Sequence, residues 1–373
     1  MKRVWWWVVT LLALAAGALV LAYQQRNFAG MLIGLSLVLV AVSVSCKPLR
    51  NTLTVMVSLV LALALAEFAL GFQQEDLLQV QMDANYWSRS DLGSSPSPGR
   101  HHARKATTAG EVIYDVDYMI GADGFRVTPG ANSSSPMRVN LFGCSFMFGE
   151  GLSDNETLPA YLSKQLPDAQ VKNFGIHGYG MHQALAIMES QRDTTGKVNF
   201  VLTAPWHAER SACVPSYALG SPRFRLLADG KVERDGVCGG ISYYPLARVL
   251  SLSRVYNLVK RAMESRQGQD PQIELYLALL RRIAELSEGR HQQLVIGFVK
   301  AEENWFKGTY SNEKIFQRLK AMNIELIDVT LADKAEDIAE LYLLNKLDGH
   351  PSAAANDARA KLVAGTIKTG LDK

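Results

Sequence analysis

Three residues of this chain have the types and positions needed for acyl chemistry. Ser145 follows the apolar run 138–142, within the sequence Gly-Cys-Ser-Phe-Met. A serine in a tight turn at the end of a strand can expose its hydroxyl and offer its own N–H group to an oxyanion. Far along the chain, Asp348 stands near His350. A nearby aspartate can fix the tautomer of a histidine and stabilise the imidazolium that forms when it takes a serine proton. We therefore expect Ser145 to act as nucleophile with His350 as its base.

Each of these features also has a simpler interpretation. A serine after a strand is often only a cap or turn residue, and the segment 143–147 does not match the GxSxG elbow of α/β-hydrolases. The segment 348–352 could be the loop before a helix, with Ser352 as its N-cap. Only their combination makes the chemical interpretation specific.

A glycine-rich turn is the third candidate feature. Residues 173–180 read Asn-Phe-Gly-Ile-His-Gly-Tyr-Gly, so backbone N–H groups could lie close to a bound oxyanion. A dinucleotide-binding loop is the alternative, but the spacing does not fit GxGxxG and no acidic residue closes the next strand. His177 and His182 flank this turn, and we expect them to line the cleft or to pack rather than to catalyse.

The elements that position these residues follow a βαβ pattern from residue 138 onward. Short apolar runs alternate with helical patterns, which predicts a parallel sheet with helices on both faces. Ligands bind at the carboxyl ends of the strands in such sheets, where the three candidate motifs fall. We predict strands at 138–142, 170–174, 198–204, 294–299 and 324–328, and helices at 157–166, 181–193, 247–265, 271–288, 312–322 and 352–369.

In this order, the three motifs resemble those of the SGNH, or GDSL-like, hydrolase family, over most of residues 138–370. Gly143 to Phe146, followed by Phe148-Gly149, looks like the nucleophile block of that family, and Asn173 to Gly180, followed by Gln183, is similar to its glycine block. The resemblance implies a three-layer α/β/α, flavodoxin-like domain. It also implies Ser145 as nucleophile, Gly178 as an oxyanion-hole glycine, and Asp348 and His350 as acid and base. Neither a metal nor an organic cofactor is expected.

The chain departs from the family pattern in three places. Cys144 replaces the aspartate before the serine, and Asp348 precedes the histidine by two residues where three is commonest. The third block lacks the asparagine that donates to the oxyanion, because residues 203–210 read Thr-Ala-Pro-Trp-His-Ala-Glu-Arg. His207 or Trp206 could donate an N–H instead. The alternative for His207 is a buried structural histidine.

The N-terminal part predicts a membrane anchor over residues 1–72. Three apolar runs, 4–23, 28–46 and 52–72, each approach the roughly 20 residues that a helix needs to cross a bilayer. The first run could instead be a cleaved signal peptide, but it is long, lacks a clean cleavage site and is followed by two further runs. We therefore expect three transmembrane helices in the lipid bilayer.

The charges that flank these runs predict the orientation of the chain. Lys2, Arg3, Lys47 and Arg50 fall on one side, which should be cytoplasmic, and only Arg26 falls on the other. Three spans then place everything after residue 72 outside the cytoplasm, in the periplasm if the host is a bacterium. Glu67 lies inside the third run, where a carboxylate is costly. It is either solvated near the interface or functional.

Residues 73–137 are expected to connect the anchor to a catalytic domain at 138–373. The stretch 73–110 is polar and rich in Ser, Pro, Gly, Arg and His, which indicates a linker or surface strap. Residues 112–118 and 125–127 flank Gly-Ala-Asp-Gly and predict a hairpin. His101 and His102 could bind a metal, but without further ligands a solvated pair is the simpler interpretation.

Two cysteines, Cys213 and Cys238, flank a polar loop of the exported part. They could form a disulfide in an oxidising compartment or remain free thiols. Neither Cys46 nor Cys144 has an obvious partner.

Charge and composition narrow the functions further. Formal net charge is only +3, and basic residues after position 100 are interleaved with acidic ones, which argues against a nucleic-acid partner. The leading hypothesis is an esterase that hydrolyses acyl esters outside the cytoplasm. A rival is acyl transfer to a carbohydrate hydroxyl of a cell-envelope polysaccharide. A third is an inactive glycan-binding envelope protein, motivated by the missing asparagine.

Overall fold

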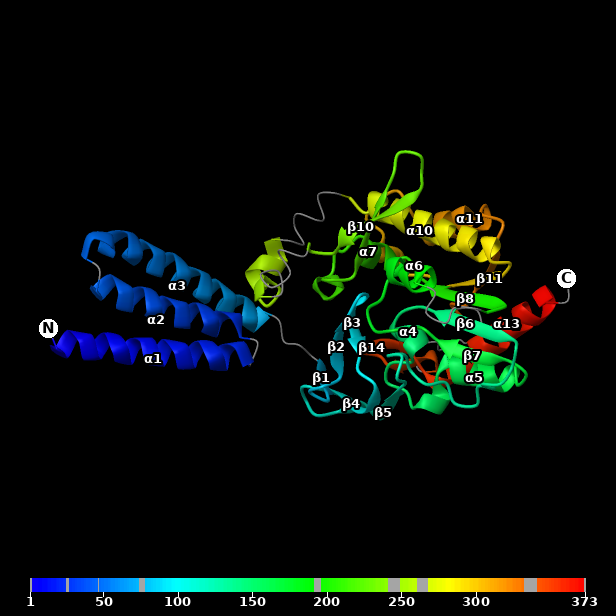
Figure 1. The fold of residues 1–373 in the computed structure, drawn as a ribbon, viewed down its shortest axis with the longest axis horizontal. Coiled ribbons are helices and arrows are strands. Elements are labelled where there is room, and N and C mark those ends of the chain that lie inside the picture. The colour runs from blue at the N-terminus through cyan, green and yellow to red at the C-terminus, as the bar shows by residue number, and fades with distance from the viewer. Residues whose placement is uncertain are drawn as a thin grey trace. The chain divides into compact units, whose positions relative to one another are not determined.

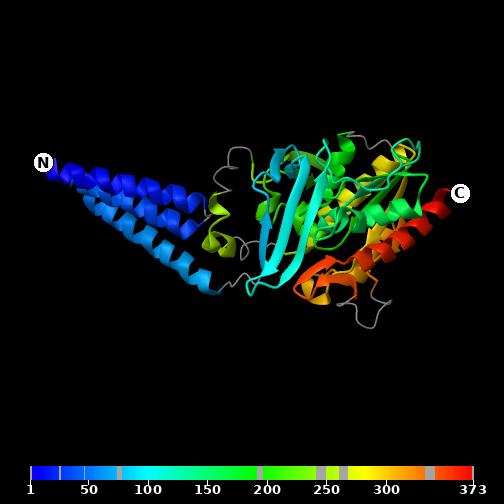
Figure 2. The same ribbon diagram turned by 90° about the horizontal axis from the view of Figure 1, so that it is seen from below.

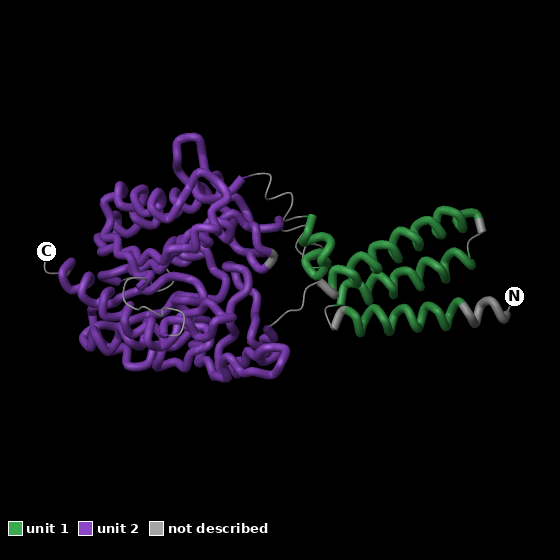
Figure 3. Tube along the Cα trace, turned by 180° about the vertical axis from the view of Figure 1, so that it is seen from behind, with its two compact units in different colours: residues 1–76, 242–266 green, residues 77–241, 267–373 purple. Residues whose placement is uncertain are grey.

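The computed structural model describes residues 2–24, 27–45, 47–73, 78–190, 196–240, 249–259, 268–331 and 341–371. These residues form two compact units (Figure 3). The smaller unit comprises Met1–Asp76 and Ser242–Arg266, and the larger comprises Leu77–Ile241 and Gln267–Lys373. Residues 78–137, which we expected to connect two domains, thus lie within the larger unit.

The smaller unit contains three apolar helices, α1 (Lys2–Gln24), α2 (Phe28–Ser45) and α3 (Arg50–Gln73), with a 3-10 turn η1 (Lys47–Leu49). By length and composition, α2 and α3 could each cross a membrane, whereas the described apolar part of α1, Val8–Ala22, is shorter. Leucines such as Leu59 and Leu65 are exposed on α3. The number of spans therefore remains a prediction.

Glu67 of α3 is buried and has partners within the same unit. Only 1% of it is exposed, and its carboxylate accepts hydrogen bonds from the backbone N–H of Arg254 at 2.8 Å and of Val255 at 3.1 Å, and from the Ser253 hydroxyl. Residues 254–259 are helical, so the carboxylate satisfies N–H groups at a helix start that lack intrahelical partners. The interpretation of Glu67 as a solvated side chain is therefore wrong. Of the predicted helix 247–265, residues 247–248 and 260–265 lie outside the described residues.

The larger unit is built on a five-stranded parallel sheet in the order β12-β11-β8-β6-β7 (Figure 1). Numbered along the chain, this order is 2-1-3-4-5, the flavodoxin-like arrangement. The five predicted strands are confirmed, each to within one residue at either end. They are β6 (Arg138–Phe142), β7 (Gln170–Asn173), β8 (Val198–Thr203), β11 (Gln293–Phe298) and β12 (Glu325–Asp328).

Helices cover both faces of this sheet, which confirms the three-layer prediction. Successive residues of a strand point to opposite faces, so Leu141 joins one core and Phe142 the other. All six residues of β8 are buried because a central parallel strand is covered on both sides. One core is closed by α6 (Met181–Glu189), α10 (Asp270–Gly289) and α11 (Asn312–Lys320), and the other by α5 (Leu158–Gln165) and α13 (Ala353–Leu371).

Residues 78–107 contain four strands where we expected a linker or surface strap, and β5 lies where we expected the first strand of a hairpin. The long antiparallel pair of β4 (Gly99–Thr107) and β5 (Val112–Ile120) is conspicuous in Figure 2 as two cyan arrows. Gly, Ser, Arg and His are not strand-favouring residues, and for that reason the pattern predicted no strand here. β5 pairs with β4 rather than with 125–127, which contributes only the single bridge of Ile120 with Arg126. The other strands are β1 (Leu78–Met82), beside β4, and the hairpin of β2 (Trp87–Ser90) with β3 (Gly93–Pro96).

The remaining elements of the larger unit are short. Cys213 and Cys238 are joined by a disulfide, and Cys144 is a free, buried thiol. Cys46 lies outside the described residues. The short elements are α4 (Ser145–Phe148), α7 (His207–Ser211), the 3-10 turns η2 (Asp154–Glu156), η3 (Ser216–Ala218) and η4 (Glu303–Trp305), the hairpin of β9 (Pro222–Leu226) with β10 (Val232–Val237), and the ribbon of β13 (Leu343–Asn345) with β14 (Asp348–Pro351).

Candidate active site

Ser145 lies at the carboxyl end of β6, as the first residue of α4. The first N–H groups of a helix have no intrahelical partner, so the N–H of Ser145 is available to a ligand. The preceding turn requires Gly143, because a Cβ there would approach Met147 to 2.8 Å and the Leu202 carbonyl to 3.2 Å. Ser145 is 5% exposed. The turn therefore holds the hydroxyl at the sheet edge where ligands bind in this fold.

The β13–β14 ribbon brings His350 and Asp348 to this serine. His350 Nε2 lies 2.9 Å from Ser145 Oγ, and His350 Nδ1 lies 2.5 Å from Asp348 Oδ1. Residues two apart in a strand point to the same side, so Asp348 and His350 of β14 lie on one side of the strand and the carboxylate can reach the ring. The three residues predicted from the sequence are thus contiguous in space.

The electrostatics of this group favour a charged imidazole. Burial alone would raise the pKa of Asp348, but hydrogen bonds from His350 and Lys105 lower it to about 2. Burial alone would lower the pKa of His350, but its hydrogen bond to Asp348 and the charge of Glu150 raise it above the ordinary value. Asp348 is therefore an anion at neutral pH, and it stabilises a proton on the ring.

Two further charged residues, Glu150 and Lys105, were not recognised in the sequence. Glu150 Oε2 lies 3.4 Å from His350 Nε2. Lys105 Nζ lies 2.9 Å from Asp348 Oδ2 and 3.4 Å from Glu150 Oε1. Glu150 directly follows the Phe-Gly pair of the nucleophile block, and that position could have drawn attention to it. Lys105 could not be found, because it lies in the stretch that resembled a linker.

His177 contacts Glu150 rather than the serine. Its Nδ1 lies 2.7 Å from Glu150 Oε2, and its Nε2 lies 2.7 Å from the Tyr86 hydroxyl. The ring packs against Phe148 at a centroid distance of 3.9 Å. The charges of His177, His350 and Lys105 outweigh burial and hold the pKa of Glu150 well below its ordinary value. His177 thus supports the carboxylate beside the catalytic candidates.

The glycine-rich turn packs directly on α4, the short helix that begins with Ser145 and that we call the nucleophile helix. A Cβ at Gly175 would approach the Phe148 nitrogen to 2.7 Å, and the Asn173 amide donates to the Met147 carbonyl at 3.2 Å. Gly178 has a φ of 73°, a conformation that favours glycine, and a Cβ there would lie 3.0 Å from the Tyr217 ring. This turn therefore depends on glycine at the position where the family resemblance expects an oxyanion donor.

His207 follows β8 as a buried, neutral ring. Burial, and to a lesser extent the charge of Arg210, lowers the pKa of His207 well below 6.5. Its Nδ1 accepts a hydrogen bond from the backbone N–H of Ala204 at 3.3 Å, so the proton of the neutral ring is on Nε2. That Nε2 has no partner among the described residues. Trp206, the other candidate donor, packs its ring against Phe146 at 5.6 Å.

Three further histidines, His182, His101 and His102, have no contact with Ser145 among the hydrogen bonds of the described residues. His182 is buried, with its Nε2 3.0 Å from the Ser221 hydroxyl, and burial lowers its pKa to about 3. His101 and His102 are neighbours in β4 and point to opposite faces, so they cannot chelate one ion together. Within the described ranges no group of three or more metal-ligating side chains occurs.

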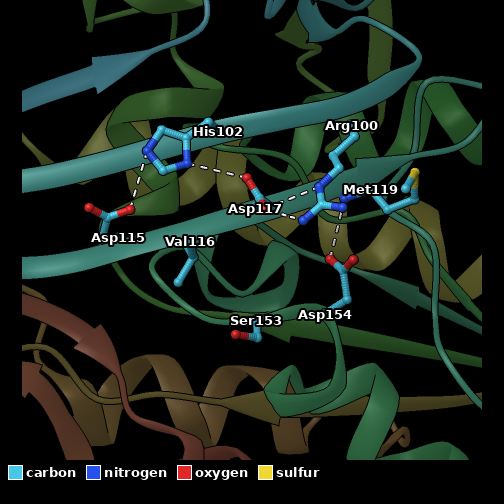
Figure 4. A pocket seen from close by; sticks show the side chains of 8 residues that line it. All are labelled: Arg100, His102, Asp115, Val116, Asp117, Met119, Ser153 and Asp154. Atoms are coloured by element: carbon cyan, nitrogen blue, oxygen red, sulfur yellow. Dashed lines mark hydrogen bonds and ion pairs between the residues drawn. The ribbon is translucent and has the colours of Figure 1, made fainter.

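A polar hollow of about 480 Å³ lies on the β4–β5 pair (Figure 4). His102 lies in it between Asp115 and Asp117, at 3.2 Å from each, and Arg100 pairs with Asp117. The charges in this hollow are thus paired with one another. Its lining residues are Arg100, His102, Asp115, Val116, Asp117, Met119, Ser153 and Asp154, which do not include the three catalytic candidates.

Comparison with known proteins finds likeness in structure. No family model matches the chain, and no curated protein matches it in sequence. Solved structures similar to it include a lipolytic protein of the G-D-S-L family from Desulfitobacterium hafniense DCB-2, at 13% identity over 62% of this chain and 99% of that one, with a TM-score of 0.36. The SGNH-hydrolase family esterase AlinE4 is 16% identical over 64% of this chain and 98% of its own, with a TM-score of 0.33. The salicylyl-acyltransferase SsfX3 from a tetracycline biosynthetic pathway is 13% identical over 62% of this chain and 53% of its own, with a TM-score of 0.37.

Proposed function

We propose that this protein is a serine esterase in which Ser145 is the nucleophile, His350 the general base and Asp348 its acid partner. The contiguous contacts from Ser145 Oγ to His350 Nε2 and from His350 Nδ1 to Asp348 carry the proposal. A nucleophile within hydrogen-bond reach of a base, with the base oriented by a third group, is the arrangement that activates a serine. The substrate is an acyl ester.

The chemistry proceeds in two steps. His350 Nε2 takes the Ser145 proton as Oγ bonds to the acyl carbon, and the same proton then passes to the departing alcohol oxygen as the ester C–O bond breaks. In the second step Nε2 takes a proton from water while the water oxygen bonds to the acyl carbon. The Oγ–C bond then breaks, the acid leaves and the proton returns to Oγ.

The developing oxyanion needs preorganised donors. We assign this role to the N–H groups of Ser145 and Gly178 and to the Nε2–H of His207. The unpartnered, neutral Nε2–H of His207 supports the last assignment, because it offers a donor in place of the missing asparagine amide.

We also propose that the site works outside the cytoplasm, on a chain anchored in the inner or plasma membrane by three transmembrane helices. Two apolar helices of sufficient length support an anchor. The disulfide between Cys213 and Cys238 supports an oxidising compartment.

Labelling with a fluorophosphonate tests the nucleophile. We expect the full-length protein in detergent to carry one adduct on Ser145, located by mass spectrometry of its peptides. Ser145→Ala should lose the adduct, and His350→Gln should slow its formation by about 1000-fold or more because the hydroxyl is no longer activated. Ser133→Ala, at an exposed serine, is the matched control and should label as the wild type does. A wild-type protein without an adduct on Ser145 would refute the esterase and favour a glycan-binding role.

Acyl transfer to a carbohydrate hydroxyl is the second candidate. Trp87 is 45% exposed and its ring lies 5.7 Å from the His177 ring, so an aromatic residue that could contact a sugar lies near the Glu150 side of the site. The same acyl-enzyme would then be resolved by an alcohol instead of water. Product analysis with a labelled acyl donor and a glycan acceptor distinguishes the two, since an esterase gives only free acid.

A further inference from the structure

Three charged side chains surround the His350 imidazole, and only Asp348 has a role so far. Glu150 approaches the ring at the nitrogen that faces the nucleophile: Nε2 lies 2.9 Å from Ser145 Oγ and 3.4 Å from Glu150 Oε2. Lys105 bridges the two carboxylates, 2.9 Å from Asp348 and 3.4 Å from Glu150. The Glu150 side chain is only 12% exposed, so water screens these charges little.

Glu150 is held in place from two sides. His177 Nδ1 donates to its Oε2 at 2.7 Å and is itself fixed by the Tyr86 hydroxyl, while the Tyr114 hydroxyl lies 3.5 Å from its Oε1. Its backbone lies in a tight turn between Gly149 and Gly151, which have φ values of 83° and 79°. The carboxylate is therefore a fixed part of the site.

We propose that Glu150 and Lys105 are positioning residues of the active site, which hold the His350 ring against Ser145 and set the balance of charge around it. This inference rests on the proposed function and adds two residues to it. Glu150 comes from the turn after the nucleophile helix and Lys105 from β4, so residues 78–120 take part in building the site.

The opposite charges of Glu150 and Lys105 act in opposite directions on the protonation of His350. With Asp348 and Glu150 ionised and Lys105 protonated, these three side chains and the His350 ring together carry no net charge when the ring is protonated. They carry one negative charge when the ring is neutral. The protonated ring occurs in both chemical steps, so the group favours the state that catalysis must reach. Without Lys105, two carboxylates would hold the ring protonated and unable to act as a base. Without Glu150, the protonated ring would lose one of the two carboxylates that stabilise it.

Each residue should therefore change the titration of His350 in its own direction. Asp348, Glu150 and Lys105 are the charged groups that act on this ring, with His177 and Tyr114 facing Glu150. Removing the charge of Glu150 lowers the pKa of His350, and removing the charge of Lys105 raises it. A single charge at such a distance shifts a pKa by about one pH unit or more.

Nuclear magnetic resonance of histidine-labelled, full-length protein in detergent micelles tests this directly. The His350 signal is assigned from its loss in His350→Gln and followed from pH 4 to 9. We expect Glu150→Gln to lower its midpoint by about one pH unit and Lys105→Met to raise it by about one pH unit. Glu288→Gln and Lys231→Met change the same charges at exposed positions and should leave the midpoint unchanged.

Opposite shifts support the proposal, whereas unchanged midpoints or shifts in the same direction overturn it. A purely structural contribution would not move the two variants apart. Lys105→Arg keeps the charge and should restore the wild-type midpoint, and Glu150→Gln decides alone if Lys105→Met does not fold. The rate of fluorophosphonate labelling against pH is a second readout, whose acid limb should move to lower pH in Glu150→Gln. If the two variants show opposite midpoint shifts but the wild-type protein is never labelled, only the esterase proposal is refuted.

Discussion

In the mechanism that we propose, His207 takes the place of the asparagine as a donor to the oxyanion. An asparagine amide is a neutral donor, and a charged imidazolium would not be its equivalent. Burial keeps the His207 ring neutral, and the hydrogen bond from the Ala204 N–H to Nδ1 places the remaining proton on Nε2. The ring thereby presents one neutral N–H, as the amide would.

This equivalence predicts a rescue. His207→Ala should lower kcat by about 100- to 1000-fold with little change in KM, because the lost donor acts on the transition state. His207→Asn should recover most of that loss, since an amide N–H returns. Steady-state hydrolysis of p-nitrophenyl acetate measures both. His182→Asn removes another buried histidine and should leave kcat of the folded protein unchanged; an equal loss of kcat there would contradict a specific role of His207.

The site residues that could be predicted are those whose type and order are diagnostic. Ser145 and His350 stood out because the serine turn, the glycine-rich turn and the Asp348–His350 segment occur together in one order, although each of them alone has a simpler interpretation. The position of Lys105 in the site could not be predicted, because it depends on the pairing of β4 with β5 and no apolar pattern indicated that pair. Contacts between residues 105 and 348 arise from tertiary packing, which the sequence pattern does not encode locally.

Among the elements, the turn that follows the nucleophile helix depends on one buried cation. Arg126 donates to the carbonyls of Gly149 at 2.6 Å, Leu152 at 2.7 Å and Phe148 at 3.1 Å, and to Asp154 at 2.7 Å. Burial lowers the pKa of Arg126, and the charge of Asp154 partly offsets this. A single guanidinium thus satisfies the polar groups of the turn that carries Glu150.

Removing this guanidinium should destabilise the larger unit strongly. Arg126→Met removes the guanidinium donor from three carbonyls and breaks the buried ion pair with Asp154, which we expect to cost about 3–5 kcal/mol of unfolding free energy. Urea denaturation followed by fluorescence measures it. Arg225→Met breaks an exposed pair with Glu233 on the β9–β10 hairpin and should cost far less, because water screens an exposed ion pair. Similar costs for the two variants would show that Arg126 is not central to the turn.

The apolar content of an element determines whether it could be predicted from the sequence. The three inner strands β6, β8 and β11 are mostly apolar because both of their faces are buried, so their composition indicated them. The edge strands β7 and β12 are shorter and more polar. Strands β1 to β4 lie in a polar stretch, and in β4 buried and exposed residues such as His101 and His102 alternate without large apolar side chains to mark the pattern. Helix α10 and helix α13 were recognised by their length and periodicity.

At the scale of the whole molecule, two independent observations favour the same compartment for the larger unit. The basic residues around the apolar helices, such as Lys47 and Arg50, favour a cytoplasmic N-terminus. With three spans, the residues after the anchor are then exported. The Cys213–Cys238 disulfide is a kind of bond that forms and persists mainly in oxidising compartments outside the cytoplasm.

Thiol accessibility in a bacterial host therefore tests the topology. In Cys238→Ser, Cys213 becomes a partly exposed free thiol, and we expect a membrane-impermeant maleimide to modify it in intact spheroplasts. In the wild type the same residue should react only after reduction, because the disulfide protects it. A cysteine introduced by Lys47→Cys should react only after lysis, since that loop is expected in the cytoplasm. If Cys213 also required lysis, the larger unit would lie on the cytoplasmic side, and an even number of spans would replace the three that we propose.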